Sequence, residues 1–426
     1  MAVVGQVYCF EINGYFSSSK IESMETTNTH RVFIIAGLLS LFVSYLGIWF
    51  RFINDPVERT GSDFIAFYSA GRVAQNEGTE NVYDPLLQQE VQEQEVGFPL
   101  VPGQVLLYNH LPFLLPILQI LVSTSYVASF YGWVILLIAL YITGIVILSY
   151  GLSRVGVDRN LTLLIGFAGF LFLPVFFSLM NGQDTAFLFL GVALWVYGLL
   201  SGKELFAGFG LSLATVRPHI ALFLAIPMLF RYRKIFMGFL LGSGVLACLS
   251  LLLLGQNGTR EFINILLLSA GGEWYGMKEN AMYNLIGLLT RAVPQLEAGP
   301  IRVMGWITYV IAVVWLCVLW LRTRDMRQGL IGLSVTLALF VAPHLHLHDL
   351  ALLLIPIYEI IRVSQTDGVL KTLTVIAMLI AISLLFLLIN ISPYLQYTIP
   401  YLIMLLLAIA PYYLKSRIPS TILHQS

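Results

Sequence analysis

The residue best placed for chemistry is Asp63, which lies shortly after the strongly apolar segment 32–50. Its surroundings, residues 61–71, are mostly apolar, small or aromatic. A carboxylate beside the end of a membrane span can take a proton from an attacking hydroxyl, as a general base does. Asp is also common at helix starts, where it caps backbone N–H groups, and Arg72 is a nearby ionic partner. We predict a general base at Asp63, with the cap and the ion pair as alternatives.

Three alternating histidines form the second candidate, His344, His346 and His348, and Asp349 follows them. In an extended chain they would share one face and could hold a metal. We expect the next helix to begin near His348, which would break that arrangement, so no metal and no cofactor is predicted. Two alternatives are that one or two histidines bind a phosphate or orient a carboxylate, and that they cap two spans.

Arg217 is the third candidate, because it stands with Pro218 and His219 in the middle of the apolar segment 204–230. A buried arginine is costly and marks a pathway or a ligand, and its planar fork suits phosphate. If the segment is a helical hairpin, Arg217 lies at its tip. If the segment crosses the membrane twice, Arg217 is a loop charge.

Two short polar stretches carry weaker signals. In the first, Asn181-Gly-Gln-Asp184, Gln183 could bind a sugar hydroxyl or cap the next helix, and Asp184 could also cap it. The second, Tyr108-Asn109-His-Leu-Pro112, stands near the start of the ambiguous apolar segment 105–122. Pro112 and Pro116 interrupt that segment. Trp49, Trp133, Trp274 and Trp306 lie near span ends and are interpreted as interface anchors.

The composition is that of a membrane protein. Of its residues, 58% are hydrophobic and 11% charged, against roughly a quarter charged in soluble domains. Backbone groups in lipid must be paired within the chain, so we predict an all-α polytopic bundle. The zero net charge argues against a nucleic-acid partner. Cys9, Cys248 and Cys317 form no C-x-x-C pair, and there is no Walker A loop or G-x-G-x-x-G motif after a strand.

Hydropathy predicts ten spans, and the segments 105–122 and 204–230 are ambiguous. A bundle of about 10–13 helices is therefore expected. The predicted spans are 32–50, 124–150, 161–180, 184–200, 235–254, 302–321, 329–343, 348–361, 372–391 and 395–414.

The basic residues predict the orientation, since cytoplasmic loops carry excess Lys and Arg. The runs 231–234 and 322–327 should face the cytoplasm, which leaves 51–104, 255–301 and 343–349 outside. We divide the chain into a cytoplasmic extension, a transmembrane domain and a cytoplasmic tail, with no cleavable signal peptide and with Met24 as an alternative start to Met1. Their ranges are 1–31, 32–414 and 415–426.

Five stretches of the sequence form an ordered set. They are Asp63-Phe64 with Gly78 and Val82-Tyr83-Asp84-Pro85, Asn109-His-Leu-Pro-Phe113, Asn181-Gly-Gln-Asp184, Ala207-Gly208 to Arg217-Pro218, and Pro343 with His348. Taken in order, these stretches resemble glycosyltransferase family 87 of the GT-C superfamily, which includes polyprenol-phosphate-mannose-dependent mannosyltransferases. Three departures are Arg217 where lysine is usual, Asn109-His-Leu-Pro in place of a double proline, and the region Ala281–Arg291, which only loosely resembles the family's Asn-x-Ser-containing segment ahead of an arginine.

The resemblance implies a GT-C-like membrane hexosyltransferase with Asp63 as catalytic base and His348 near the donor phosphate or the reacting hydroxyl. Its donor would be a polyprenyl-phosphate-linked hexose, with mannose as the expected sugar, and its acceptor a lipid or glycan hydroxyl, with inversion. The active site would face outward from a bacterial inner membrane, among membrane lipids. The residues predicted to bind the donor phosphate or sugar are Arg217, His219, His344, His346, Asn181, Gln183, Tyr108 and Asn109.

Two other functions fit parts of the sequence. A transporter or flippase of a lipid-linked or polar solute would explain Arg217 in a broken apolar segment, and it predicts a site at the midplane between related halves. An inactive scaffold predicts that Asp63 and the histidines point apart.

Overall fold

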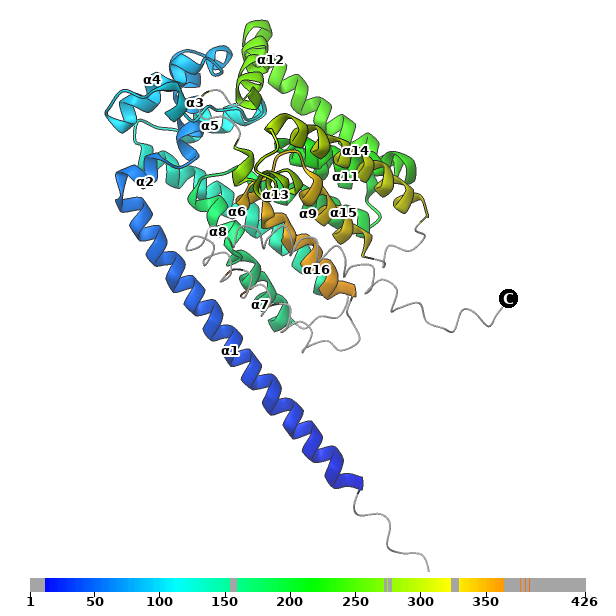
Figure 1. Ribbon diagram of the computed structural model, residues 1–426. Coiled ribbons are helices and arrows are strands. Elements are labelled where there is room, and N and C mark those ends of the chain that lie inside the picture. Colours follow the sequence, from blue (N-terminus) through cyan, green and yellow to red (C-terminus); the bar gives the residue numbers. More distant parts are fainter. Residues whose placement is uncertain are drawn as a thin grey trace, which may run out of the picture.

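The computed structural model is helical throughout the part of the chain that it describes (Figure 1). That part contains no strand, as expected for an all-α membrane protein. The described residues are 12–153, 159–271, 274, 278–322, 329–363, 376, 380 and 383.

Sixteen α-helices and several short 3₁₀ helices follow one another in the described ranges. The α-helices are α1 (Ile12–Asn54), α2 (Pro56–Thr60), α3 (Phe64–Asn76), α4 (Pro85–Val96), α5 (Leu115–Leu121), α6 (Tyr126–Ser153), α7 (Arg159–Phe170), α8 (Leu173–Met180), α9 (Thr185–Leu200), α10 (Glu204–Ser212), α11 (Pro218–Arg231), α12 (Arg233–Gly271), α13 (Leu285–Ala292), α14 (Ala298–Arg322), α15 (Leu330–Val341) and α16 (Leu354–Val363). The 3₁₀ helices are η1 (Thr79–Asn81), η2 (Pro102–Gln104), η3 (Pro112–Leu114), η4 (Leu213–Val216), η5 (Glu279–Ala281) and η7 (Leu347–Leu353).

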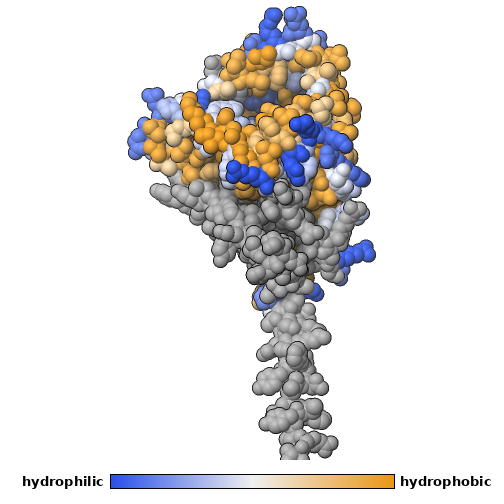
Figure 2. Space-filling model, turned by 90° about the vertical axis from the view of Figure 1, so that its right-hand side faces the viewer, coloured by the Kyte–Doolittle hydropathy of each residue, from blue (hydrophilic) through white to orange (hydrophobic). Residues whose placement is uncertain are grey.

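The protein is an all-α polytopic membrane protein. In the described ranges, four helices are long and apolar enough to cross a membrane, and the bent pair of α7 and α8 makes a fifth candidate. The four lie in α1, α6, α12 and α14, and Figure 1 shows α1 continuing well beyond the bundle. Their exposed apolar side chains, such as Phe42, Ile135, Leu252 and Val310, suit contact with lipid. Figure 2 shows one largely hydrophobic face, in which a hollow has a hydrophilic floor.

The predicted spans agree with these helices in position, with two differences. The span 161–180 is broken, because α7 and α8 meet at a bend of 45°; Pro174 stands in the first turn of α8, where it cannot continue a preceding helix. The apolar helices α9, α11 and α15 are shorter than the span length of about 20 residues. The predicted spans 372–391 and 395–414 lie outside the described residues, apart from Ile376, Ile380 and Ser383.

The predicted outer segments are mostly helical rather than open loops. Residues 51–104 form α2, α3 and α4, with Asp55 and Asp84 capping the first turns of α2 and α4. The segment predicted to start at 255 begins with a real break, since Gly255 has φ 60° and ψ −165°. Beyond it, however, the chain is again helical to Gly271. The polar residues of segment 51–104 had been interpreted as a loop, but they form helices, two of which are capped by Asp55 and Asp84.

The ambiguous segment 204–230 is a helical hairpin. A Cβ on Gly238 would lie 2.4 Å from Leu205 O, and one on Gly242 would lie 2.4 Å from Ser212 Oγ, so α10 and α12 pack closely and run in the same direction. The chain must therefore return through α11 from Arg217 to the start of α12. Arg217 lies at the tip, which is the first of the two alternatives, and Lys203 and Arg233 lie together at the opposite end.

The core that supports this tip is apolar and aromatic. α9 is buried on almost all sides, as a helix that is hydrophobic all round should be. Trp133, Trp195 and Phe223 are fully buried. Trp133 had been interpreted as an interface anchor, and the structure corrects this. Its indole lies inside the bundle, where Nε1 donates to the carbonyl of Gly182.

Candidate active site

The first turn of α3 presents Asp63 to the interior of the bundle. Phe64 and Phe67, both fully buried, fix this helix in the core. The Asp63 side chain makes no hydrogen bond that caps the helix, and Arg72 donates to Gln75 instead. Asp63 Oδ2 accepts a hydrogen bond of 2.6 Å from Gln183 Nε2. Neither the cap nor the ion pair accounts for Asp63, and its partner comes from a distant part of the chain.

The tight turn between α8 and α9 places Gln183. Gly182 has φ +66°, which L side chains rarely adopt. Trp133 Nε1 donates to the carbonyl of Gly182 at 2.7 Å, and a Cβ on Gly182 would lie 2.8 Å from Phe64 Cβ. The turn is therefore held between α6 and the start of α3, and it delivers Gln183 to Asp63.

Replacing Gly182 with alanine is expected to lower both stability and activity. The left-handed backbone alone costs about 1–2 kcal/mol, and contact with Phe64 would displace the turn and Gln183. Gly202→Ala is the matched control, because Gly202 has φ +67° but no atom near its added Cβ. Thermal unfolding and transfer assays should show a stability loss in both variants and an activity loss only at Gly182. Equal activity in the two variants would contradict the positioning of Gln183 by this turn.

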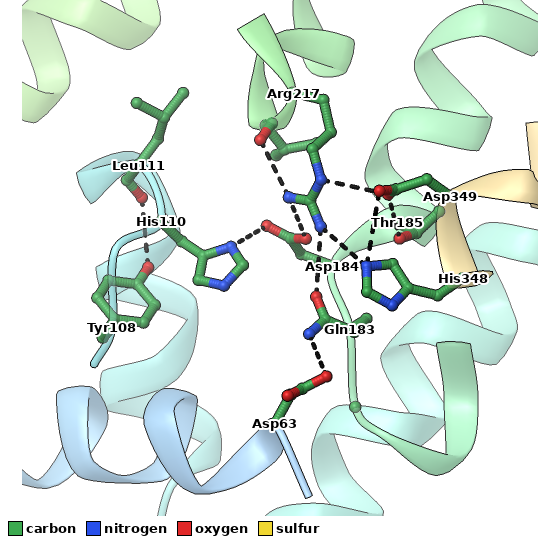
Figure 3. A network of polar contacts seen from close by, with 12 residues as sticks. Asp63, Tyr108, His110, Leu111, Gln183, Asp184, Thr185, Arg217, His348 and Asp349 are labelled. Carbon is green, nitrogen blue, oxygen red and sulfur yellow. Dashed lines mark hydrogen bonds and ion pairs between the residues drawn. The ribbon is translucent and has the colours of Figure 1, made fainter. Parts of the chain in front are cut away.

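Arg217 is the centre of a buried polar network (Figure 3). Its Nε donates to Asp349 Oδ1 at 3.2 Å, and its Nη1 lies 2.9 Å from Asp184 Oδ1. Nη1 also donates to the Val216 carbonyl, while Nη2 donates to Gln183 Oε1 at 3.3 Å and lies 3.5 Å from His348 Nε2. The three nitrogens thus contact five groups, of which Asp184 Oδ1 is paired with Arg217 by charge and not by a hydrogen bond.

Two fully buried carboxylates and a histidine complete the network. Asp184 and Asp349 are 0% exposed. His110 Nδ1 donates to Asp184 Oδ2 at 2.8 Å, and Thr185 Oγ1 donates to Asp349 Oδ1 at 3.1 Å. Buried charges are tolerated when they are paired and hydrogen-bonded in this way. The network joins α3, the loop before η3, the α8–α9 turn, the hairpin tip and η7.

His348 lies on the side of Arg217 opposite His110 (Figure 3), and His344 and His346 precede it in the chain. His346 N donates to Asp349 Oδ2 at 3.2 Å, and the rings of His344 and His346 are 4.6 Å apart. The predicted outer segment 255–301 supports them, since Tyr283 N donates to Leu345 O at 3.1 Å and Asn284 Nδ2 donates to Ala342 O at 2.6 Å. As expected, η7 starts at Leu347. In the described part of the chain, no three His, Cys, Asp or Glu side chains gather as a metal site.

The histidines are neutral at physiological pH. Burial lowers the pKa of His348 to about 4 and lowers the pKa of His346 and of His344 as well. A neutral imidazole offers one donor and one acceptor nitrogen. This segment can therefore hydrogen-bond a ligand without adding positive charge.

The same shift predicts acid sensitivity. In the unfolded chain His348 has a pKa near 6.5, so between about pH 6.5 and 4 the unfolded state binds more protons and folding stability rises with pH. We expect the melting temperature of the purified protein to fall as the pH is lowered through this window. His348→Gln should show a shallower fall. Equal slopes for the two proteins would contradict a buried neutral His348.

The other predicted donor-binding residues lie outside the network. Tyr108 is fully buried, and its hydroxyl donates to Leu111 O. Asn109 Nδ2 donates to Ser269 Oγ at 2.9 Å, and Asn181 ends α8, where its backbone N–H donates to the Phe177 carbonyl at 3.0 Å. The carbonyl of His219 accepts from Tyr309 at 2.6 Å. The structure thus brings together Asp63, Gln183, Arg217 and His348 but not these four.

Three network residues were missed or undervalued in the sequence analysis. His110 received no role, Asp184 was interpreted as a helix cap, and Asp349 only as a neighbour of the histidines. A signal was available, because a buried arginine in an apolar hairpin needs carboxylate partners. Asp184 and Asp349 both stand at the starts of apolar helices, where such a partner could come from.

The all-helical bundle with its apolar spans defines a polytopic membrane protein. Its half-buried acid, held by a buried polar network, forms an enzyme-like site. The model of glycosyltransferase family 87 matches residues 109–343, more than half of the chain. The chain belongs to glycosyltransferase family 87 and is a membrane glycosyltransferase. No curated protein and no solved structure matches it significantly.

Proposed function

We propose that the protein transfers a hexose, mannose, from a polyprenyl-phosphate carrier to a hydroxyl of a lipid or glycan, with Asp63 as the general base. The observation that carries the proposal is the placement of Asp63. One carboxylate oxygen is held by Gln183 at 2.6 Å, and the side chain is partly exposed at the start of α3. The family supports glycosyl transfer; the donor, the acceptor and the mechanism are our proposal.

A single carboxylate suffices for this chemistry. As the acceptor oxygen attacks the anomeric carbon, Asp63 takes the hydroxyl proton. The bond from that carbon to the phosphate oxygen breaks, and its electron pair leaves with polyprenyl phosphate, which needs no proton. Displacement in one step inverts the anomeric centre, by the logic of inverting carboxylate enzymes. Holding donor and acceptor side by side lowers the entropic barrier.

The phosphate of the donor is assigned to the histidine segment rather than to Arg217. Arg217 is paired with the buried carboxylates of Asp184 and Asp349 and donates to Gln183, so its guanidinium would have to give up these partners to bind a phosphate. His344 and His346 are both half-buried, and their rings lie 4.6 Å apart. Neutral imidazole N–H groups can donate to phosphate oxygens.

The hairpin supports a site on the extracytoplasmic side of a bacterial inner membrane. Lys203 and Arg233 lie at the end of the hairpin opposite Arg217, and basic residues concentrate on the cytoplasmic side. The network would then face outward, where a polyprenyl-linked sugar arrives through the membrane.

The network also weighs against the two alternatives. A transporter site would use Arg217 for its solute, but Arg217 is held by two carboxylates. A scaffold predicts that Asp63 and the histidines point apart, whereas Gln183 and Arg217 join Asp63 to His348 (Figure 3).

The donor test uses the purified protein in lipid vesicles with acceptor lipids. We expect radiolabelled mannose to be transferred from mannosyl polyprenyl phosphate and not from a nucleotide-linked mannose, and we expect the product to have the inverted anomeric configuration. Glucosyl polyprenyl phosphate tests the choice of hexose in the same assay. Transfer from the nucleotide-linked sugar alone, or retention of configuration, would overturn the proposal.

A further inference from the structure

The orientation of the Gln183 amide is fixed by its two neighbours. Arginine has only donors, so the atom that faces Arg217 must be the carbonyl oxygen of Gln183. The amide nitrogen must then face Asp63, to whose Oδ2 it donates at 2.6 Å. The order Arg217, Gln183, Asp63 therefore runs in one direction from donor to acceptor, whatever hydrogen positions are assigned.

This order has a consequence for Asp63. A hydrogen bond to a charged oxygen is stronger than one between neutral groups, so this bond fixes the position of the Asp63 carboxylate. Asp63 Oδ1 has no hydrogen bond or ion pair with the residues that the structure describes. We propose that Gln183 is a positioning residue, which fixes the Asp63 carboxylate and turns its second oxygen toward the acceptor hydroxyl. This inference rests on the proposed role of Asp63 as base.

Gln183 itself is sealed from substrate. It is only 6% exposed, and both ends of its amide are engaged by protein groups. Arg217, which fixes the carbonyl end, is in turn held by Asp184 at 2.9 Å and by Asp349 at 3.2 Å. The buried ion pairs thus fix the position of Asp63 through the side chain of Gln183. Binding of a sugar hydroxyl by Gln183 would require this amide to break one of its two bonds.

Two substitutions test the inference by steady-state kinetics over a range of pH. In Gln183→Ala, kcat should fall about 10- to 100-fold, the effect of losing one hydrogen bond to a charged group. The KM of donor and acceptor should stay unchanged, because Gln183 does not touch either substrate. In Gln183→Glu, activity should decline as pH rises, because an ionised glutamate has no donor to offer Asp63.

Gln92→Ala is the matched control. Gln92 is 2% exposed and donates to Ser69 Oγ and the Leu106 carbonyl, so its loss costs buried amide bonds away from the network. We expect this variant to lose stability but to keep the wild-type kcat and KM. If Gln183→Ala raises KM and leaves kcat unchanged, Gln183 binds substrate and the inference is wrong. If Asp63→Asn is as active as wild type, the proposed base has failed instead.

Discussion

Asp63→Asn should abolish most of the transferase activity while leaving the fold intact. Asparagine has nearly the same shape, and its carbonyl oxygen can still accept the bond that Gln183 donates at 2.6 Å. It cannot take a proton from the acceptor hydroxyl, and removal of a general base costs about 100- to 10,000-fold in rate. The loss should appear in kcat, measured by transfer of labelled sugar at saturating donor.

Asp55→Asn provides the control for this substitution. Asp55 lies in the same predicted outer segment, 51–104, and its carboxylate caps α2 by accepting from Val57 N and Glu58 N. Asparagine caps helices as well as aspartate does, so this variant should retain both its stability and its transfer rate. A loss of rate shared equally by the two variants would point to a general effect of charge on the outer segment rather than to a base.

Arg217→Met should have the largest effect on stability. It would leave Asp184 and Asp349 buried in the same network without their shared cation. Removing one partner of a buried ion pair costs about 3–5 kcal/mol, because the remaining charge is uncompensated. We expect a strong fall in melting temperature and aggregation in size-exclusion chromatography. Arg217→Lys should fold but with lower stability, since lysine has three donors in place of five.

The triple variant Arg217→Met, Asp184→Asn, Asp349→Asn separates charge from packing. Replacing a whole buried ionic group by neutral residues is often neutral in stability, so this variant should be more stable than Arg217→Met alone. Its kcat should stay as low as that of Gln183→Ala, because Gln183 loses the donor that orients it. A single Arg217→Met variant as stable as wild type would show that the network is not a structural centre.

The sequence predicted the parts of the fold that depend on local pattern. Apolar runs located the membrane helices, and the polar interruption at Arg217 marked the tip of a hairpin. The break at Gly255 and the start of η7 near His348 were also anticipated. The sequence did not predict the bend between α7 and α8 or the helices after Asp55 and Asp84. Polar helices and kinks lack a strong apolar period.

The sequence predicted several residues of the site but not the contacts between them. Asp63, Arg217, Gln183 and His348 were singled out by their chemistry, and they do converge. Their partners depend on contacts between distant segments; His110 and Asp184, for example, are brought together only by the fold. For this reason the sequence could not show that Arg217, predicted to bind phosphate, donates to Gln183, or that Gln183, predicted to bind a sugar, donates to Asp63.

The most direct test of the account is a structure of the Asp63→Asn protein with mannosyl polyprenyl phosphate and an acceptor lipid bound. We predict that the acceptor hydroxyl lies about 3 Å from the residue 63 side chain, or is separated from it by one water. The anomeric carbon should lie beyond this hydroxyl, with the phosphate beside the histidine segment. An acceptor hydroxyl bound far from residue 63, with another acidic side chain against it, would contradict the assignment of Asp63 as the base.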